Sequence, residues 1–199
     1  MPTRRNSGFT LVELMTVLVV ALVLLLVAMP SFQAYIQRQK IRSAADEVLS
    51  VWNDARFEAA KRNVNVKFGY RTSGADFCVG AATTTNPNDT TPCDCTQAAP
   101  SSDVCDVSRY PADQGQWNGV TLNGGTTIGG ANHVVVFDLK QLRLVDPTGA
   151  GAISLDDPAG SKAYRMNVRV DRFGRGVICQ SNASSLDNLP GMEFRKCAP

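Results

Sequence analysis

The segment SGFTLVELMTVLVVALVLLLVAM, residues 7–29, is the most apolar part of the chain. It follows a short polar leader that carries Arg4 and Arg5. The 21 residues from Phe9 to Met29 match the length that a helix needs to cross a bilayer. Because both arginines precede the run, the positive-inside rule predicts a cytoplasmic N-terminus and an exported remainder. A cleaved secretory signal fits poorly, because the run is long and no A-x-A-like site follows it.

One acidic residue, Glu13, interrupts this apolar run. An acidic side chain in lipid is costly, so it usually marks a function and implies a cationic partner. Cleavage after Gly8 would supply that partner, because the new amine of Phe9 would lie one helical turn from Glu13. A plain membrane anchor would leave Glu13 unexplained.

The octapeptide at residues 7–14 resembles the class III signal of type IV prepilins and type II secretion pseudopilins. The resemblance implies that prepilin peptidase cuts after Gly8 and methylates the new N-terminus at Phe9. It also implies that Glu13 pairs with the N-terminal amine of a neighbouring pilin or pseudopilin during filament assembly. Pro30 matches the proline in the middle of the long pilin helix. The implied location is the bacterial inner membrane, crossed once, with a cytoplasmic N-terminus before processing, a periplasmic head, and association with a filament after assembly.

Beyond Pro30, where a kink or a loosened turn is expected, the apolar residues recur with helical spacing. The members of this stripe are Ile41, Ala45, Val48, Trp52, Ala55 and Ala59. A single helix from Phe9 to about Arg62 would be about 80 Å long. The stripe covers only about three heptads, so packing on a sheet is favoured over a coiled-coil seam.

After Asn63 the apolar residues alternate with polar ones, which predicts strands. The candidate strands are Val64–Tyr70, Phe77–Val79, Val120–Leu122, His133–Phe137, Leu142–Val145, Tyr164–Asp171 and Gly176–Cys179. The turn from Asp171 to Gly176 is expected to join the last two strands as a hairpin. The predicted fold is therefore α+β and type IV pilin-like, with one long N-terminal helix packed on an antiparallel β-sheet head.

These features divide the chain into four segments. They are a leader peptide at 1–8, a transmembrane and assembly helix at 9–30, an amphipathic helix at 31–63 and a β-rich periplasmic head at 64–199. Within the head, the stretch 81–116 is polar, contains prolines and lacks periodicity. We interpret it as a disulfide-stapled insertion that could contact neighbouring subunits; a tolerated surface insertion is the alternative.

The chain has six cysteines, a number typical of exported domains that form disulfides. Disulfides are favoured over a thiolate metal site, because no C-x-x-C pair is present and export leads to an oxidising compartment. Sequence alone cannot choose among the pairings. We expect Cys179 to pair with Cys197, and the other four to pair among themselves around the insertion. Those four are Cys78, Cys93, Cys95 and Cys105.

Catalytic and cofactor chemistry find little support in the sequence. The single histidine, His133, is expected to cap or border a strand and has no matching nucleophile motif. The glycine-rich stretch 123–130 lacks a P-loop lysine and is interpreted as turns. We therefore predict a protein that is not an enzyme and has no metal or other cofactor.

The helix end at residues 55–63 and the turn Gly174-Arg175-Gly176 are similar to the GspH/FimT branch of minor pilins. That branch includes GspH of type II secretion and FimT and FimU of type IV pili. The resemblance implies a minor pilin or pseudopilin that primes or caps a type IV pilus. The alternative is a GspH-type minor pseudopilin of the type II protein secretion system.

Some FimT proteins bind DNA in natural transformation through a G-R-x-R turn, which suggests a third interpretation. This chain has Gly174-Arg175-Gly176-Val177, so the second arginine is missing. A formal net charge of only +2 also argues against a protein built mainly to coat nucleic acid. The candidate contacts to DNA or a partner are Arg169, Arg172 and Arg175, and a solvated strand face is the alternative.

Overall fold

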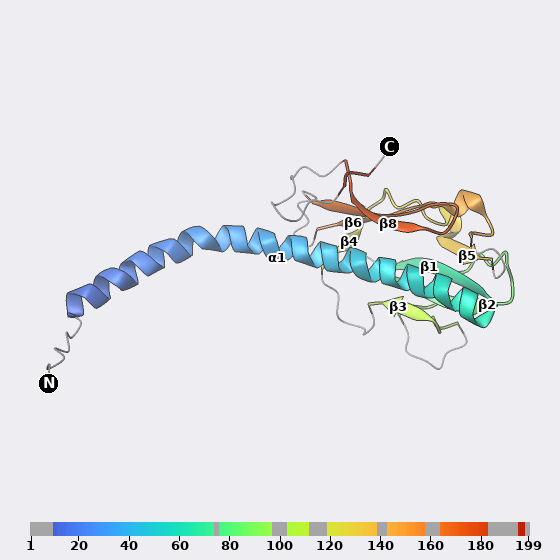
Figure 1. The fold of residues 1–199 in the computed structure, drawn as a ribbon, viewed down its shortest axis with the longest axis horizontal. Helices are drawn as coiled ribbons and strands as arrows, with labels where there is room; N and C mark the ends of the chain where they lie inside the picture. Colours follow the sequence, from blue (N-terminus) through green and yellow to red (C-terminus); the bar gives the residue numbers. More distant parts are fainter. Residues whose placement is uncertain are drawn as a thin grey trace, which may run out of the picture. The chain divides into compact units, whose positions relative to one another are not determined.

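The computed structural model describes residues 10–73, 76–96, 103–111, 119–138, 143–157, 164–182 and 195–197. The chain divides into two compact units, Met1–Ile36 and Gln37–Pro199. One helix, α1 (Leu11–Arg62), runs from the first unit into the second (Figure 1). Pro30 lies within α1 and does not end it. The helix ends as predicted near Arg62, where Asn63 adopts a left-handed conformation (φ 53°) that breaks the helical path.

In the second unit, α1 buries the apolar stripe that the sequence predicted. The residues of the stripe are completely buried: Ile41, Ala45, Val48, Trp52, Ala55 and Ala59. Small alanines at three of these positions let the strands approach the helix closely. The stripe therefore packs on sheet, as expected, and contributes one side of a single hydrophobic core.

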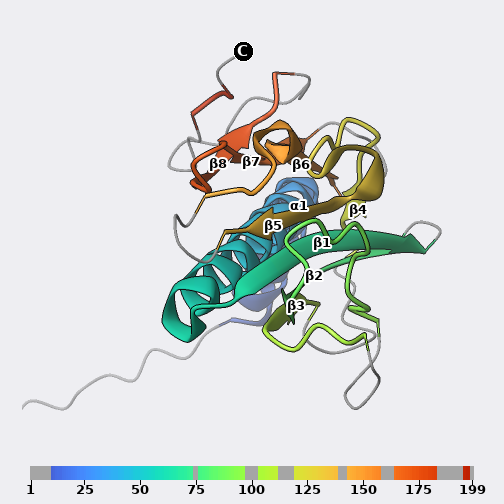
Figure 2. The ribbon, with the colours of Figure 1, turned by 90° about the vertical axis from the view of Figure 1, so that its right-hand side faces the viewer.

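The strands form two antiparallel four-stranded sheets, which Figure 2 shows as separate groups around α1. The first sheet has the order β3-β2-β1-β5, with β1 (Asn65–Ser73), β2 (Asp76–Thr84), β3 (Ser108–Tyr110) and β5 (Val134–Phe137). The second has the order β4-β6-β7-β8, with β4 (Thr121–Leu122), β6 (Gly151–Asp156), β7 (Arg165–Val170) and β8 (Gly176–Gln180). Two single-turn 3-10 helices, η1 (Gly130–Asn132) and η2 (Pro147–Gly149), lie between strands.

The sequence-based strand assignment needs three corrections. β6 was not predicted; Ile153–Asp156 does alternate apolar and polar residues, but the strand is short, begins with Gly151 and Ala152, and buries its polar Ser154 and Asp156 as well. The stretch 81–116 is not wholly irregular, because Ala81–Thr84 completes β2 and β3 follows. The predicted strand Leu142–Val145 lies partly outside the described residues, and in the described part only Leu144 forms an isolated bridge, to Phe137.

Trp52 lies where α1 meets both sheets. Its ring centroid is 5.0 Å from that of Phe68 in β1 and 4.6 Å from that of Phe137 in β5. Its indole nitrogen donates a 3.0 Å hydrogen bond to the carbonyl of Gly174, in the turn between β7 and β8. A Cβ atom at Gly176 would lie 2.5 Å from Cδ1 of Leu49 and 3.1 Å from the ring of Trp52, so a larger residue here would require these side chains to shift.

Three disulfides brace the head. Cys179 bonds to Cys197, the pair that we selected from the sequence. The bond Cys78–Cys95 ties the segment from Cys93 to Cys105 to β2, and the bond Cys93–Cys105 closes that segment on itself. These four cysteines and Ala82 form a small apolar cluster separate from the main core. The bonds therefore build a second layer on the first sheet, outside the layer that contacts α1.

Gly80 sits under this second layer, where a Cβ atom would lie 2.2 Å from the sulfur of Cys105. We expect Gly80→Ala to destabilise the full-length protein in detergent by about 1–3 kcal/mol, because the disulfide layer must shift. Thermal and urea unfolding measure the change. The matched control is Gly124→Ala, because a Cβ atom there meets nothing within 4 Å. Equal stability of the two variants would contradict the close packing of Gly80.

Candidate functional site

The N-terminal end of α1 is organised around Glu13. Thr10 precedes the helix, and its hydroxyl accepts a 3.3 Å hydrogen bond from the amide of Glu13. In return, the Glu13 carboxylate accepts hydrogen bonds from the Thr10 amide (3.2 Å) and hydroxyl (3.1 Å). This reciprocal pattern is a capping box, which satisfies amides that the first helical turn leaves free. The carboxylate is thereby held at the N-terminal end of the helix.

The remaining residues proposed for processing and assembly are not placed in detail. Gly8 and Phe9 lie outside the described residues, and for Pro30 only the helical backbone is described. The large apolar side chains between Leu11 and Leu26 are 56–73% exposed. A surface this apolar needs cover from lipid or other helices. Among the described residues, no helix contains a stretch long and apolar enough to span a bilayer.

The second candidate surface is the turn between β7 and β8, residues 171–176, here called the hairpin tip. The side chain of Asp171 accepts 2.9 Å hydrogen bonds from the amides of Phe173 and Arg175, and a 2.7 Å bond from the Arg175 guanidinium. Burial alone would raise the pKa of Asp171, but these hydrogen bonds and the charge of Arg175 hold it below its ordinary value. Together with the Trp52 bond to Gly174, they make the tip a rigid platform.

Of the three arginines of the candidate DNA contact, Arg172 and Arg175 lie together on the hairpin tip and Arg169 lies outside it. Arg175 is paired with Asp171. Arg172 lies 5.1 Å from the ring centroid of Phe173, and Arg175 lies 5.7 Å from it. Arg169 is exposed on β7, in strand register with Val177, outside the tip. Sequence analysis missed Phe173, which is 52% exposed beside two guanidinium groups; an aromatic residue inside an arginine-rich turn was the available signal.

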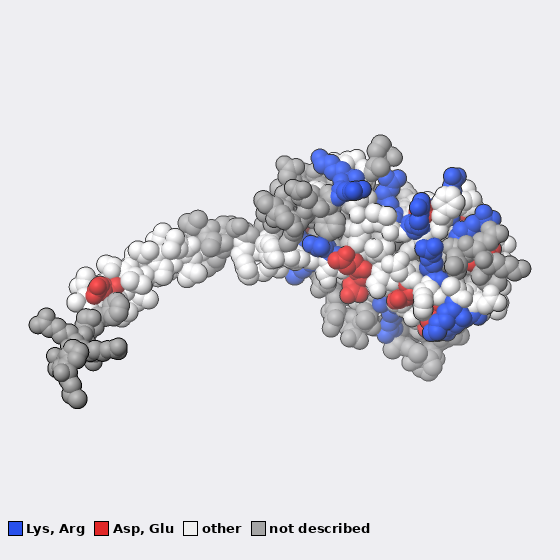
Figure 3. Space-filling model, viewed as in Figure 1, with Lys and Arg blue, Asp and Glu red and all other residues white. Residues whose placement is uncertain are grey.

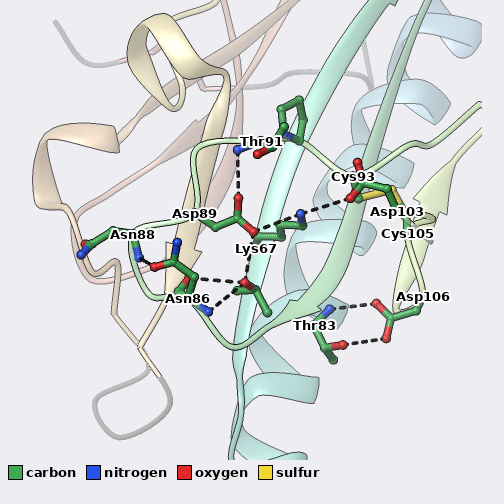
Figure 4. A network of polar contacts seen from close by, with 12 residues as sticks. Lys67, Thr83, Asn86, Asn88, Asp89, Thr91, Cys93, Asp103, Cys105 and Asp106 are labelled. Atoms are coloured by element: carbon green, nitrogen blue, oxygen red, sulfur yellow. Dashed lines mark hydrogen bonds and ion pairs between the residues drawn. A yellow bond between two sulfur atoms is a disulfide. The ribbon is translucent and has the colours of Figure 1, made fainter.

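A third polar constellation joins the first sheet to the disulfide layer (Figure 4). Lys67 on β1 is only 7% exposed, and its ammonium lies 3.1 Å from Asp89 and 3.6 Å from Asp103. Thr91 and Thr84 also donate hydrogen bonds to Asp89, at 3.0 and 3.1 Å. The ammonium thus links Asp89 and Asp103, which lie before Cys93 and after Cys95 in the sequence, to the first sheet. No sequence signal could have found this group, because its members meet only after the disulfides pair.

The charge state of Asp89 follows from these contacts. Burial alone would raise its pKa, but the hydrogen bonds from Thr91 and Lys67 and the charge of Lys67 lower it below the usual value of 3.8. The contribution of Asp89 to stability is therefore complete above that value and is lost as the pH falls through the lower pKa of the folded state.

His133 borders β5, as expected. Its Nδ1 atom lies 2.6 Å from the hydroxyl of Tyr70, in a contact that fixes the chain before the strand. Within the described part of the chain, no three His, Cys, Asp or Glu side chains gather in a way that could hold a metal ion.

Comparison with known proteins identifies the N-terminal segment. Residues 3–29 match the family model of the prokaryotic N-terminal methylation motif. The methylation motif is type IV prepilin-like, and it contains the capping box of Thr10 and Glu13 described above. No curated protein and no solved structure matches the chain.

The methylation motif supports a pilin-like or pseudopilin-like protein that is processed as a prepilin and assembles with other pilins. It suggests a structural subunit and implies an N-terminus anchored in a bacterial membrane. The fold agrees, because a long N-terminal helix is followed by antiparallel sheets braced by disulfides, as in the type IV pilin-like fold.

The Lys67 contacts make a stability prediction that depends on pH. Lys67→Met should cost about 2 kcal/mol at about pH 7, because it leaves the Asp89 carboxylate without its cation. The cost should shrink as the pH falls through the lowered pKa of Asp89, because the carboxylate then becomes protonated. Urea unfolding of the full-length protein in detergent measures the cost at each pH. Lys61→Met removes an exposed lysine and should cost under about 0.5 kcal/mol. A cost independent of pH would show that Lys67 acts only by packing.

Proposed function

We propose that this protein is a minor pilin that is cleaved by prepilin peptidase after Gly8, N-methylated at Phe9, and incorporated into a type IV pilus filament, which it primes or caps. The observation that carries the proposal is the methylation motif at residues 3–29, joined by one helix to a disulfide-braced head. In this proposal the protein works by packing and performs no chemistry of its own.

We propose a separate role for each consecutive segment of the chain. Residues 1–8 are the leader, residues 9–30 cross the inner membrane once, and residues 31–63 carry the head at 64–199 into the periplasm. The exposed apolar surface between Leu11 and Leu26 supports a change of environment, from lipid to the helices of other subunits. Pro30 would loosen the helix between the two halves.

Glu13 has a specific role in this proposal. Its capped position in the first turn supports this role, because cleavage after Gly8 would create an amine only four residues before Glu13 in the sequence. In a filament, an unpaired carboxylate among apolar helices is costly, so the amine of a neighbouring subunit would set the register of assembly.

Glu13→Ala tests this role, with Thr10→Ala as its matched control. The control removes the capping hydroxyl but keeps the carboxylate, so it separates helix capping from pairing between subunits. We expect both variants to be cleaved after Gly8, and only Glu13→Ala to be lost from sheared filaments on immunoblots, by about tenfold or more. Normal incorporation of Glu13→Ala would refute the pairing.

The main alternative is a GspH-type minor pseudopilin of the type II secretion system, which shares the methylation motif. A deletion strain separates the two when surface pili and secreted exoproteins are scored side by side. We expect pili to be lost and secretion to persist. Loss of secretion with intact pili would assign the protein to type II secretion, and restoration by the full-length gene is the control.

A further inference from the structure

We propose that the hairpin tip of one subunit docks on an acidic face of α1 in a second copy of this chain. The acidic face consists of Asp46, Glu47, Ser50 and Asp54. This inference rests on the proposed filament function and adds the contact through which the heads associate.

The hairpin tip is built to present one aromatic ring and positive charge to a partner. Phe173 is half-exposed, and the guanidinium groups of Arg172 and Arg175 lie 5.1 and 5.7 Å from its ring centroid. Asp171 and the Trp52 bond fix the backbone beneath the ring, so little conformational entropy remains to be lost on binding. The guanidinium of Arg175 forms an ion pair with Asp171, whereas the one contact described for Arg172 is with Phe173.

The acidic face lies on the side of α1 that the head leaves uncovered. Residues 46–54 contain three carboxylates and no lysine or arginine. Glu47, Ser50 and Asp54 follow one another at helical spacing and are all exposed, with the small side chain of Ser50 between the two acids. The carboxylates of Asp46 and Asp54 have contacts of their own, a 3.9 Å pair with Arg42 and a hydrogen bond from Ser108, but neither is buried by them.

The two surfaces cannot meet within one molecule. The hairpin tip is tied to Trp52 on the buried side of α1, while the acidic face is on the exposed side of the same helix. Figure 3 shows acidic groups over the helix and basic groups over the neighbouring β7–β8 side of the head. The complementary charges are therefore available to another molecule.

Charge complementarity on two different patches of one chain favours a second copy as the occupant. A contact between unlike patches is heterologous, so two copies joined by it still present one unused patch each to a further subunit. An aromatic anchor flanked by arginines is also the composition enriched at protein interfaces. The tip would place Phe173 over Ser50 and bring Arg172 to Glu47.

Site-specific photocrosslinking in cells tests this contact with the full-length protein. Two copies carrying different epitope tags are expressed together, and one of them carries a photocrosslinking residue at Ser50. We expect a crosslinked product that contains both tags. The control probe is at Thr72, which is exposed at the end of β1 and outside both surfaces. A probe at Leu18 reports assembly through the apolar helix independently of the heads.

Charge reversal then identifies the partners. Arg172→Glu and Glu47→Arg should each lower the Ser50 product by about tenfold, because like charges would face each other. The chain with both substitutions should recover it, because the charges are again complementary. Both positions are exposed, so the fold should persist; unchanged thermal unfolding checks this.

The outcomes distinguish this inference from the proposed function. Crosslinks from Leu18 without a two-tag product from Ser50 would overturn the docking and leave the filament function standing. Absence of both products would overturn both. A Ser50 product without the second tag, or one insensitive to charge reversal, would assign the acidic face to another protein. Low-salt retention of DNA that is lost in Arg172→Glu but not in Glu47→Arg would assign the tip to nucleic acid, and would likewise overturn the docking.

Discussion

The side chain of Trp52 is the contact on which the head depends, because it joins one helix to two separate sheets. Its ring packs against Phe68 and Phe137 of the first sheet, and its single polar atom is satisfied by the carbonyl of Gly174 in the second. A buried indole N–H without a hydrogen-bond acceptor would lower the stability of the folded state, so the turn must approach the helix closely. Gly176 makes this approach sterically feasible. The position of the hairpin tip is therefore set by the core.

The sequence predicts the elements whose signal is local and repeated. Helical periodicity around Trp52 and the alternating pattern of β7 were sufficient for the long helix, the closing hairpin and the α+β class. β6 was missed because its alternating stretch, Ile153 to Asp156, is only four residues long and follows a glycine and an alanine, which give a weak strand signal. The separation into two sheets was missed as well, because it depends on contacts with α1 that no single strand encodes.

The candidate functional residues likewise include some that the sequence could reveal and some that it could not. Glu13 could be recognised because an acid in an apolar run is improbable without a function, whatever the fold around it. Lys67 could not, because an isolated lysine in a strand looks like any solvated lysine. It becomes a buried cation only when Cys78–Cys95 and Cys93–Cys105 bring Asp89 and the rest of the segment over β1. The disulfides and this ion pair thus stabilise one layer by different means, one covalent and the other electrostatic and dependent on pH.

The capping box gives Glu13 a structural role that does not depend on any partner. Its carboxylate accepts hydrogen bonds from Thr10 and so caps the N-terminal end of the helix. Acids at this end of a helix are also favoured by its dipole, so the position costs little in the unassembled protein. Proposed cleavage after Gly8 would add a positive charge within a turn of the same carboxylate. The electrostatic requirement for assembly could then be met by the local geometry that already begins the helix, without rearranging the segment.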